Sequence, residues 1–357
     1  MRKKLKDVCM FYSGTGFPIQ YQGQTKGEYP FYKVGDIANN AIAGKIYLEL
    51  CNNYISSDVA KMIKGCILPK DTVVFAKIGE ALKLNRRAIT SCDCLIDNNA
   101  MGIAPKLDSL RIQYFYFCMK NLKMQTLAES TTVPSVRKTV LEKYEIEVPS
   151  LVEQEEIEKK LTLTQKIIEK RRQELSYLDE IIKARFVEMF GDPVKNPKGW
   201  EVVTIGDIVT EVRYGTSKPA VEGGKYPYLR MNNLTADGHL DLNDLKYIDI
   251  PDDEIEKCVV RKGDVLFNRT NSIELVGKTV VFDLQEDMII AGYIIRVRLN
   301  KRLLPEILSQ YMNLEALKDI LRSMAKGAVN QANINAQELR SIKVYIPDME
   351  YIIPTDE

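Results

Sequence analysis

The alternation of hydrophobic and polar residues is most regular in the middle of the chain, over residues 150–191. Apolar residues recur there every seven positions, with a second and less regular position between them. Such a repeat is typical of a helix that packs along another helix. The expected interface consists of Leu161, Ile168, Leu175, Ile182 and Met189, with Ile157 and Leu178 at the second position. We therefore predict one long coiled-coil-forming helix that requires a partner helix.

Both ends of this predicted helix carry recognisable signals. Ser150 is followed three residues later by Glu153, the spacing of a capping box, and Gly191 and Pro193 follow the last apolar position. A helix of this length would extend roughly 60 Å. One helix of an ordinary helical core is the alternative interpretation, but the chain has no second helical pattern of comparable length.

The segments on either side of the helix resemble each other more than they resemble the helix. Both contain short β-branched and aromatic runs that predict strands, and each has a helical pattern, over 110–127 and 305–324. Five pairs of motifs recur in the same order: 5–8 with 205–208, 14–15 with 215–216, 29–32 with 226–229, 67–75 with 259–267, and 141–149 with 339–347. A collinear repeat of this kind predicts two copies of one domain.

The predicted fold class is therefore α+β, with two repeated mixed α/β domains separated by the long helix. The predicted boundaries are 1–149 for the first domain, 150–191 for the helix, 192–199 for a linker, 200–347 for the second domain and 348–357 for a short tail. Pro354 interrupts any helix in that tail, so we expect no second long helix after the second domain.

Composition narrows the function classes without selecting one. The 50 basic and 49 acidic residues nearly cancel, which argues against a protein that binds nucleic acid unaided. No apolar run is long enough to span a membrane, so we expect a cytoplasmic protein. The seven cysteines show no Cys-x-x-Cys spacing, which favours reduced thiols.

The chain lacks the residues that catalysis would need. His239 is the only histidine, which leaves almost no material for a catalytic triad and suggests no zinc site. The glycines of "SGTGFP" at 13–18 lack the rest of a nucleotide-binding motif, and the acidic residues at 252–254 are explained by a surface turn. We predict a protein that is not an enzyme and that holds no metal or cofactor of its own.

Several stretches resemble the specificity subunits of type I restriction-modification systems. The most specific are "VPSLVEQEEIEKKL" at 148–161 and "ARFVEMFGDPVKNPKGWEV" at 184–202, which are similar to the central conserved region of many such subunits. Supporting matches are Gly-Thr-Ser-Lys-Pro at 215–219, "RKGDVLF" at 261–267 and "NINAQELRSIKVYIP" at 333–347. The resemblance covers nearly the whole chain.

This resemblance implies a role in reading DNA. Each repeated domain would be a target-recognition domain for one half of a split double-stranded DNA sequence. The helix would be a spacer on which adenine methyltransferase subunits dock and, through them, restriction subunits. S-adenosylmethionine, ATP and magnesium would be bound by those partners. A rigid helix suits this task, because half-sites read on one face of a duplex lie about 34 Å apart or a multiple of that distance.

Polar loops at 128–138 and 326–336 carry donors and acceptors suited to bases and phosphates, although solvated turns would have the same composition. Residue type and loop placement select the DNA-contacting residues Thr15, Lys77, Lys83, Arg86, Arg87 and Arg137 in the first domain, and Thr216, Lys218, Arg230, Arg269, Asn271, Asn330, Gln331 and Asn333 in the second. Two alternatives stay open: an inactive copy that occupies methyltransferase partners, and an adaptor that binds no DNA and uses the helix as a dock. The helix could also pair two copies of the chain.

Overall fold

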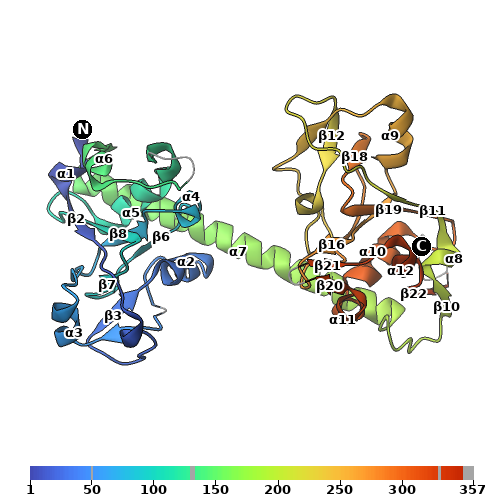
Figure 1. Cartoon of the computed structure of the whole chain (residues 1–357), viewed down its shortest axis with the longest axis horizontal. Coiled ribbons are helices and arrows are strands. Elements are labelled where there is room, and N and C mark those ends of the chain that lie inside the picture. Colours follow the sequence, from blue (N-terminus) through green and yellow to red (C-terminus); the bar gives the residue numbers. More distant parts are fainter. Residues whose placement is uncertain (50, 129–132, 329–330, 349–357) are drawn as a thin grey trace. The chain divides into compact units, whose positions relative to one another are not determined.

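The computed structural model describes residues 1–49, 51–128, 133–328 and 331–348 (Figure 1). The chain divides into two compact units, Met1–Lys170 and Arg171–Glu357, each with its own sheets and hydrophobic cores. The boundary between the units falls within the long helix α7, Leu151–Phe190. The predicted α+β class, with two mixed domains and a long intervening helix, is confirmed.

Helix α7 begins and ends at the residues that the sequence signals indicate. The Ser150 backbone N–H donates to Glu153 Oε2 at 2.8 Å, and the Glu153 N–H donates to Ser150 Oγ at 3.3 Å, which completes the capping box. Gly191 follows the last helical residue with φ of +87°, a left-handed conformation that glycine adopts without strain. The prediction of one uninterrupted helix is therefore confirmed.

The described residues of the first unit form three small sheets. The four-stranded sheet is antiparallel and its order is β2 (Cys9–Ser13), β8 (Ala100–Pro105), β5 (Val73–Ala76) and β6 (Arg87–Ile89). The three-stranded sheet has the order β4 (Tyr54–Ile55), β3 (Tyr29–Tyr32) and β7 (Leu95–Ile96), and β1 (Arg2–Lys4) pairs with β9 (Glu145–Glu147). The helices are α1 (Leu5–Val8), α2 (Val34–Ile42), α3 (Ser57–Met62), α4 (Glu80–Lys83), α5 (Ile112–Asn121) and α6 (Lys138–Lys143).

The second unit repeats these sheets in the same order. The sheet that corresponds to β2-β8-β5-β6 is β11 (Val209–Tyr214), β19 (Ile294–Leu299), β15 (Val265–Asn268) and β17 (Thr279–Val281). Strand β10 (Glu201–Thr204) pairs with β22 (Lys343–Ile346), as β1 pairs with β9. The sheet that corresponds to β4-β3-β7 is β13 (Lys246–Ile248), β12 (Tyr226–Leu229) and β18 (Met288–Ile290), extended by β14 (Val259–Val260). A further sheet has the order β16 (Thr270–Asn271), β21 (Gln331–Asn333) and β20 (Lys326–Ala328). The helices are α8 (Ile205–Ile208), α9 (Asp252–Cys258), α10 (Pro305–Asn313), α11 (Glu315–Met324) and α12 (Ala336–Arg340).

The repeated Gly-Thr motif has a structural cause. A Cβ atom on Gly14 would lie 1.7 Å from the carbonyl oxygen of Asp97, and one on Gly215 would lie 2.1 Å from that of Ile290. Both distances are far below van der Waals contact, so only glycine allows the following threonine to bridge the neighbouring strand end. The internal repeat predicted from sequence is therefore confirmed, and this motif recurs because the same backbone approach recurs.

Helix α7 joins the first unit through buried polar contacts. Gln154 donates from Nε2 to the carbonyls of Ser109 and Pro149, both at 2.9 Å. Glu158, buried beside it, accepts from Arg111 Nε at 2.7 Å and from the Tyr114 backbone N–H at 2.8 Å. The carboxylate therefore binds the first turn of α5, where helix N–H groups lack partners.

In the second unit the last turns of α7 are held by apolar packing. Phe186 and Phe190 belong to the largest hydrophobic core, and the Phe186 ring meets Tyr311 of α10 edge-on with centroids 5.1 Å apart. Trp200 donates from Nε1 to the Phe190 carbonyl at 2.8 Å. This end of the helix is therefore part of the core of the second unit.

Two predicted helices are shorter than expected. The pattern over 110–127 forms α5 only to Asn121, followed by a 3₁₀ turn at Met124–Leu127. The pattern over 305–324 is split at Leu314, which has an extended backbone between α10 and α11. In the described part of the chain, no helix combines the length and hydrophobicity that a membrane crossing needs.

Candidate nucleic-acid interface

A pocket of about 570 Å³ in the second unit gathers four residues that the sequence selected as DNA contacts. They come from three separate parts of the chain: Thr216 and Lys218 after β11, Arg230 after β12, and Arg269 after β15. Tyr228 and Tyr293 contribute aromatic surface to the same pocket. The fold thus brings together residues as far apart in sequence as Thr216 and Arg269.

Arg269 is held in place by contacts on several sides. Its guanidinium carbon lies 4.8 Å from the centre of the Tyr214 ring, within the range of a cation–π interaction. Nη1 donates to the Gly292 carbonyl at 3.4 Å, and Nε is buried without a hydrogen-bond partner among the described residues. Within that same part of the chain, no carboxylate pairs with this side chain. Arg269 therefore brings an uncompensated positive charge to the pocket.

The two other cations of the pocket have acidic partners. Arg230 Nη2 lies 2.8 Å from Asp244 Oδ2, and the hydrogen bonds from Lys246 and Arg230 hold the pKa of Asp244 below its ordinary value. Lys218 Nζ lies 2.8 Å from Glu254 Oε2. Since an ion pair lowers the attraction of a cation for phosphate, Arg230 and Lys218 contribute less net charge than Arg269.

The predicted asparagine contacts lie on the small sheet beside this pocket. Asn271 ends β16 and Asn333 ends β21, and these strands pair so that Thr270 is opposite Asn333. The Thr270 hydroxyl donates to Asn333 Oδ1 at 3.4 Å, and Asn271 Nδ2 donates to Asn268 at 3.0 Å. Gln331 begins β21, whereas Asn330 lies outside the described residues.

In the first unit, Thr15 and Lys77 occupy the same structural positions as Thr216 and Arg269. Thr15 follows Gly14 and bridges Asp97, as Thr216 follows Gly215 and bridges Ala291. Lys77 follows the last residue of β5, and its backbone carbonyl accepts from the Val136 N–H at 2.9 Å. The sequence choice of equivalent residues in both copies therefore corresponds to equivalent places in the fold.

The other cations selected in the first unit are more scattered. Lys83 ends α4 and pairs with Glu80 at 2.6 Å on the surface. Arg86 follows that helix and is half-buried, while Arg137 is exposed at the N-cap of α6. Lys83 and Arg86 therefore lie at the end of α4, and Arg137 lies at the start of α6.

Arg87 corrects the sequence interpretation. Its side chain is only 3% exposed, and it donates to the carbonyls of Met119 at 2.9 Å and Leu122 at 3.0 Å. Burial lowers its pKa to about 10. The guanidinium stabilises the end of α5 from inside the fold, so Arg87 is not accessible to DNA. The sequence signal for this burial is that Arg87 begins a strand and is followed directly by the apolar residues Ala88 and Ile89.

The predicted helix interface is exposed only along the middle of α7. Leu175, Leu178 and Ile182 are 63%, 54% and 51% exposed, and Leu161 and Ile168 are also exposed. The end positions differ, because Ile157 packs on the core of the first unit and Met189 on that of the second. Both end residues therefore already have partners within the chain.

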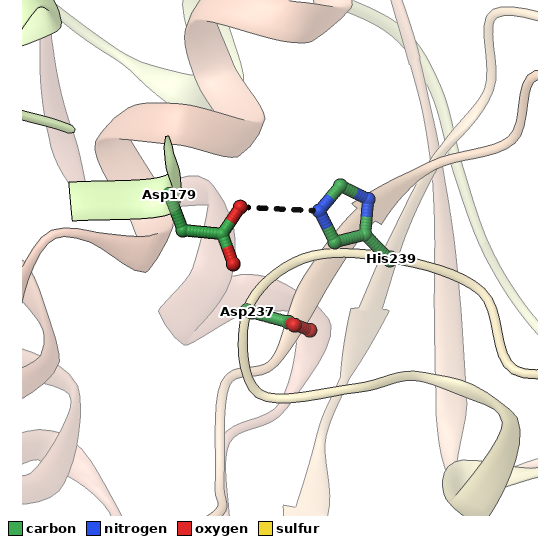
Figure 2. A group of neighbouring side chains, drawn as sticks. All are labelled: Asp179, Asp237 and His239. Carbon is green, nitrogen blue, oxygen red and sulfur yellow. Dashed lines mark ion pairs between the residues drawn. The ribbon is translucent and has the colours of Figure 1, made fainter. Parts of the chain in front are cut away.

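Asp179 on α7 meets Asp237 and His239 from the loop that follows Leu234 (Figure 2). One ligand-type atom from each side chain lies within 4.8 Å of the others, and His239 Nε2 is 4.0 Å from Asp179 Oδ1. Burial alone would raise the pKa of Asp237, but a hydrogen bond from Thr235 and nearby positive charge lower it. We assign the half-buried Asp179 and the exposed Asp237 and His239 the role of attaching the loop to α7 within the second unit, a proximity that the sequence could not indicate.

Lys33 is a further candidate contact that was not predicted from the sequence. Lys33 follows β3 as Arg230 follows β12, and each backbone N–H donates to a side chain three residues later, at 2.8 Å and 2.9 Å. Lys33 lies 5.6 Å from the Phe17 ring centre. Because both residues come directly after the repeated Tyr-Pro strands, alignment of the two halves could have identified Lys33.

Comparison with known proteins supplies the family. Residues 1–177 and 197–351 match the family model described as "Type I restriction modification DNA specificity domain". The specificity subunit of the type I restriction enzyme EcoKI from Escherichia coli is 25% identical over 244 residues, which cover 64% of this chain and 52% of that protein. The MjaIX specificity subunit of Methanocaldococcus jannaschii is 27% identical over 258 residues, covering 65% and 57%.

A solved type I restriction-modification S subunit from M. genitalium is 14% identical, with 98% of this chain and 86% of that one covered and a TM-score of 0.45. The matched regions span little more than half of the length of the two curated relatives. The family match, in contrast, includes both repeated units and the first part of α7. The chain therefore belongs to the type I restriction-modification DNA specificity family.

Proposed function

We propose that this protein is the DNA-reading subunit of a type I restriction-modification complex. Residues 1–149 and 200–347, hereafter the first and second domains, would each read one half of a split double-stranded target. Helix α7 would separate them, with 192–199 as a linker. The observation that carries the proposal is the family match across both copies, and the cation-lined pocket of the second domain supports it.

The chain itself would catalyse no reaction. Its role would be to bring methyltransferase subunits, and through them restriction subunits, to a defined sequence. Those partners would supply S-adenosylmethionine, ATP and magnesium. The near-zero net charge of the chain is consistent with this role, because partner subunits can contribute part of the positive surface that binds phosphates. A DNA-reading role would also place the chain in the cytoplasm.

A domain exchange tests the proposal. The chain is co-expressed with cognate methyltransferase subunits in cells that lack other adenine methylation, and the methylated sites are sequenced. We expect one motif with two separated halves. Replacing residues 1–149 by the corresponding domain of another family member should change one half only. A change in both halves, or no methylation by an assembled complex, would contradict the proposal, and methylation by the isolated chain would contradict its non-catalytic role.

We further propose that the exposed stripe on α7 is covered by another helix, from a second copy of this chain or from a methyltransferase subunit. Fully burying a side chain such as Leu175 or Ile182 is worth roughly 1.5–3 kcal/mol. Five stripe residues are exposed: Leu161, Ile168, Leu175, Leu178 and Ile182. An antiparallel pair with two-fold symmetry is the simplest arrangement for two copies.

Charges placed in the stripe test this second proposal. Leu175→Asp with Ile182→Asp should abolish self-association and methyltransferase recruitment, because unpaired charges would enter an apolar seam. Gln173→Asp with Ala184→Asp adds the same charge to the opposite side of α7 and should preserve both. Light scattering and co-purification measure the outcome. A wild-type chain that remains monomeric at micromolar concentration and recruits no partner would overturn the proposal.

A further inference from the structure

The two domains contain one site in duplicate, at equivalent positions of the fold. The Lys77 backbone N–H donates to the Asn99 carbonyl at 2.8 Å, and that of Arg269 donates to the Tyr293 carbonyl at 2.9 Å. The backbone carbonyl of Lys77 accepts from the Val136 N–H, two residues before α6, at 2.9 Å. The carbonyl of Arg269 accepts from the Ile334 N–H, two residues before α12, also at 2.9 Å. The backbone therefore presents Lys77 and Arg269 from the same place.

The side chains at this place differ in what they can recognise. A guanidinium offers two parallel N–H donors in a rigid plane, which match the N7 and O6 acceptors of guanine or two phosphate oxygens. The ammonium group of Lys77 is a compact charge without such a plane. At this position the second domain can therefore form paired hydrogen bonds that depend on the orientation of the Arg269 guanidinium, whereas the first domain cannot.

The surroundings of Arg269 favour a base edge over a phosphate. The cation–π contact with Tyr214 and the hydrogen bond to the Gly292 carbonyl restrain the guanidinium, whereas a phosphate can also be bound by a mobile surface cation. Arg269 also lacks a carboxylate partner among the described residues, unlike Arg230 and Lys218 in the same pocket. Its donors are thus restrained in orientation and its charge is uncompensated.

We propose that Arg269 reads a guanine in the second half-site through paired hydrogen bonds to N7 and O6. This inference rests on the proposed DNA-reading function and specifies the base that this position recognises. Arg230 lines the same pocket, and Lys33 and Lys77 occupy the corresponding positions in the first domain. Lys33 is thereby assigned to the DNA-contacting surface.

Sequencing of methylated sites with the full complex tests the proposal. The wild-type motif should contain an invariant guanine in its second half. Arg269→Lys keeps the charge but loses the paired geometry, so it should reduce discrimination at that one position by roughly 5- to 150-fold. Recognition of the first half-site by the same variant shows that the complex is folded. Lys77→Arg, the matched substitution in the first domain, should leave the second half-site unchanged.

A chemical substitution in the DNA avoids altering the protein. Replacing that guanine with 7-deazaguanine removes the N7 acceptor and should weaken binding of the wild-type complex, with little further effect on the Arg269→Lys variant. The same replacement at another guanine of the second half-site serves as the control.

Three results would overturn the inference. The first is a second half-site without an invariant guanine, and the second is an unchanged motif in Arg269→Lys. The third is that Arg269→Lys weakens DNA binding equally on all sequences and makes the affinity less dependent on salt, which indicates a phosphate contact. The proposed function fails separately if the wild-type complex methylates no two-part motif at all, and the inference then fails with it.

Discussion

The two domains build the same four-stranded sheet but place different chemistry on one of its faces. In the first domain, Gly102 lies opposite Val74 in the β5–β8 pairing, and Ala104 lies opposite Met10. The small residues leave space that Leu68, fully buried, fills: a Cβ on Gly102 would lie 2.4 Å from its Cδ2 atom. This face is held by close apolar packing.

In the second domain the equivalent face carries a charged network. Arg296 occupies the position of Gly102, is fully buried, and donates to Glu211 Oε2 at 2.6 Å and to the Val259 carbonyl. Arg298 occupies the position of Ala104 and binds Glu211 at 3.0 Å and Asp264 at 2.8 Å. Two arginines and two carboxylates therefore replace small and apolar residues.

This difference shows that the strand order, and the register of β5–β8 and β15–β19, do not depend on the chemistry of that face. The edge strand differs, because β11 pairs with β19 through a register shift between Val209 and Glu211, whereas β2 pairs with β8 without a shift. The opposite face is apolar in both sheets, with Val73 and Phe75 in one core and Val265 and Phe267 in the other. Burial of that face specifies the register, because a shift of one residue would expose it. The variable face can then change its means of stabilisation without changing the fold.

The largest expected effect comes from removing the buried arginine. Arg296→Ala removes the donor to the Val259 carbonyl and one of the arginine partners of Glu211, and breaking a buried ion pair costs about 3–5 kcal/mol. Urea unfolding followed by tryptophan fluorescence measures it, since the only tryptophan, Trp200, packs on the core of the second domain.

Arg302→Ala is the matched control for that variant. It breaks a surface ion pair with Glu201, whose atoms are 2.7 Å apart, and should cost less than about 1 kcal/mol. If the two arginine variants unfold at the same denaturant concentration, the charged network does not stabilise the second domain.

A smaller effect is expected from adding a methyl group to the packed face of the first domain. Gly102→Ala forces Leu68 or Thr72 to move and should cost about 1–3 kcal/mol. Faster hydrogen exchange of β8 amides would report this loss, while Trp200 fluorescence should be unaffected. Gly35→Ala is the control, because its Cβ would meet no atom within 4 Å. Slow exchange that persists in β8 would argue against tight packing at Gly102.

Acid should affect the second domain through Glu211. Burial alone would raise the pKa of Glu211, but hydrogen bonds and charges from Arg213, Arg296 and Arg298 outweigh it and lower the pKa below the ordinary 4.5. The carboxylate therefore stabilises the folded domain above pH 4.5, and this stabilisation is lost as the pH falls through the folded-state pKa.

The measurement compares wild type with Glu211→Gln by Trp200 fluorescence during urea unfolding from neutral to acidic pH. The variant should be less stable at neutral pH and should lose less stability on acidification. Identical pH profiles would remove Glu211 from the acid response. In the first domain the pKa of Asp36 is shifted in the opposite direction, because burial of its carboxyl group raises it.

The smallest effects concern a helix cap that only the second domain possesses. Thr204 and Asp207 form a capping box at α8, with the Thr204 N–H donating to Asp207 Oδ2 at 2.8 Å. The equivalent residue of α1, Lys4, makes no side-chain cap, although Asp7 stands where Asp207 does.

Thr204→Ala should therefore destabilise the second domain by about 1 kcal/mol, whereas Lys4→Thr should stabilise the first by about 0.5–1 kcal/mol. Tryptophan fluorescence measures the former and hydrogen exchange of β1 and α1 amides the latter. A Lys4→Thr variant with unchanged exchange would show that the two helices are not equivalent in their caps.

The sequence by itself determined the long helix and the internal repeat. Helix α7 could be read from a local period of seven and from caps at Ser150 and Gly191, which act within a few residues. The repeat was visible because Gly14 and Gly215 are required by the same close backbone approach. Thr15, Thr216, Lys77 and Arg269 were selected by residue type and loop placement, and the fold puts them in equivalent pairs.

Only the tertiary structure decided which charged side chains are available to a ligand. Arg87 and Arg269 look alike in sequence, yet Arg87 is buried against carbonyl groups while Arg269 lines a pocket beside Tyr214. Ion pairs such as Arg230 with Asp244 likewise join residues whose proximity depends on how strands turn back. The physical reason is range: caps and heptads depend on neighbours in sequence, whereas exposure and charge compensation depend on atoms that distant segments bring together.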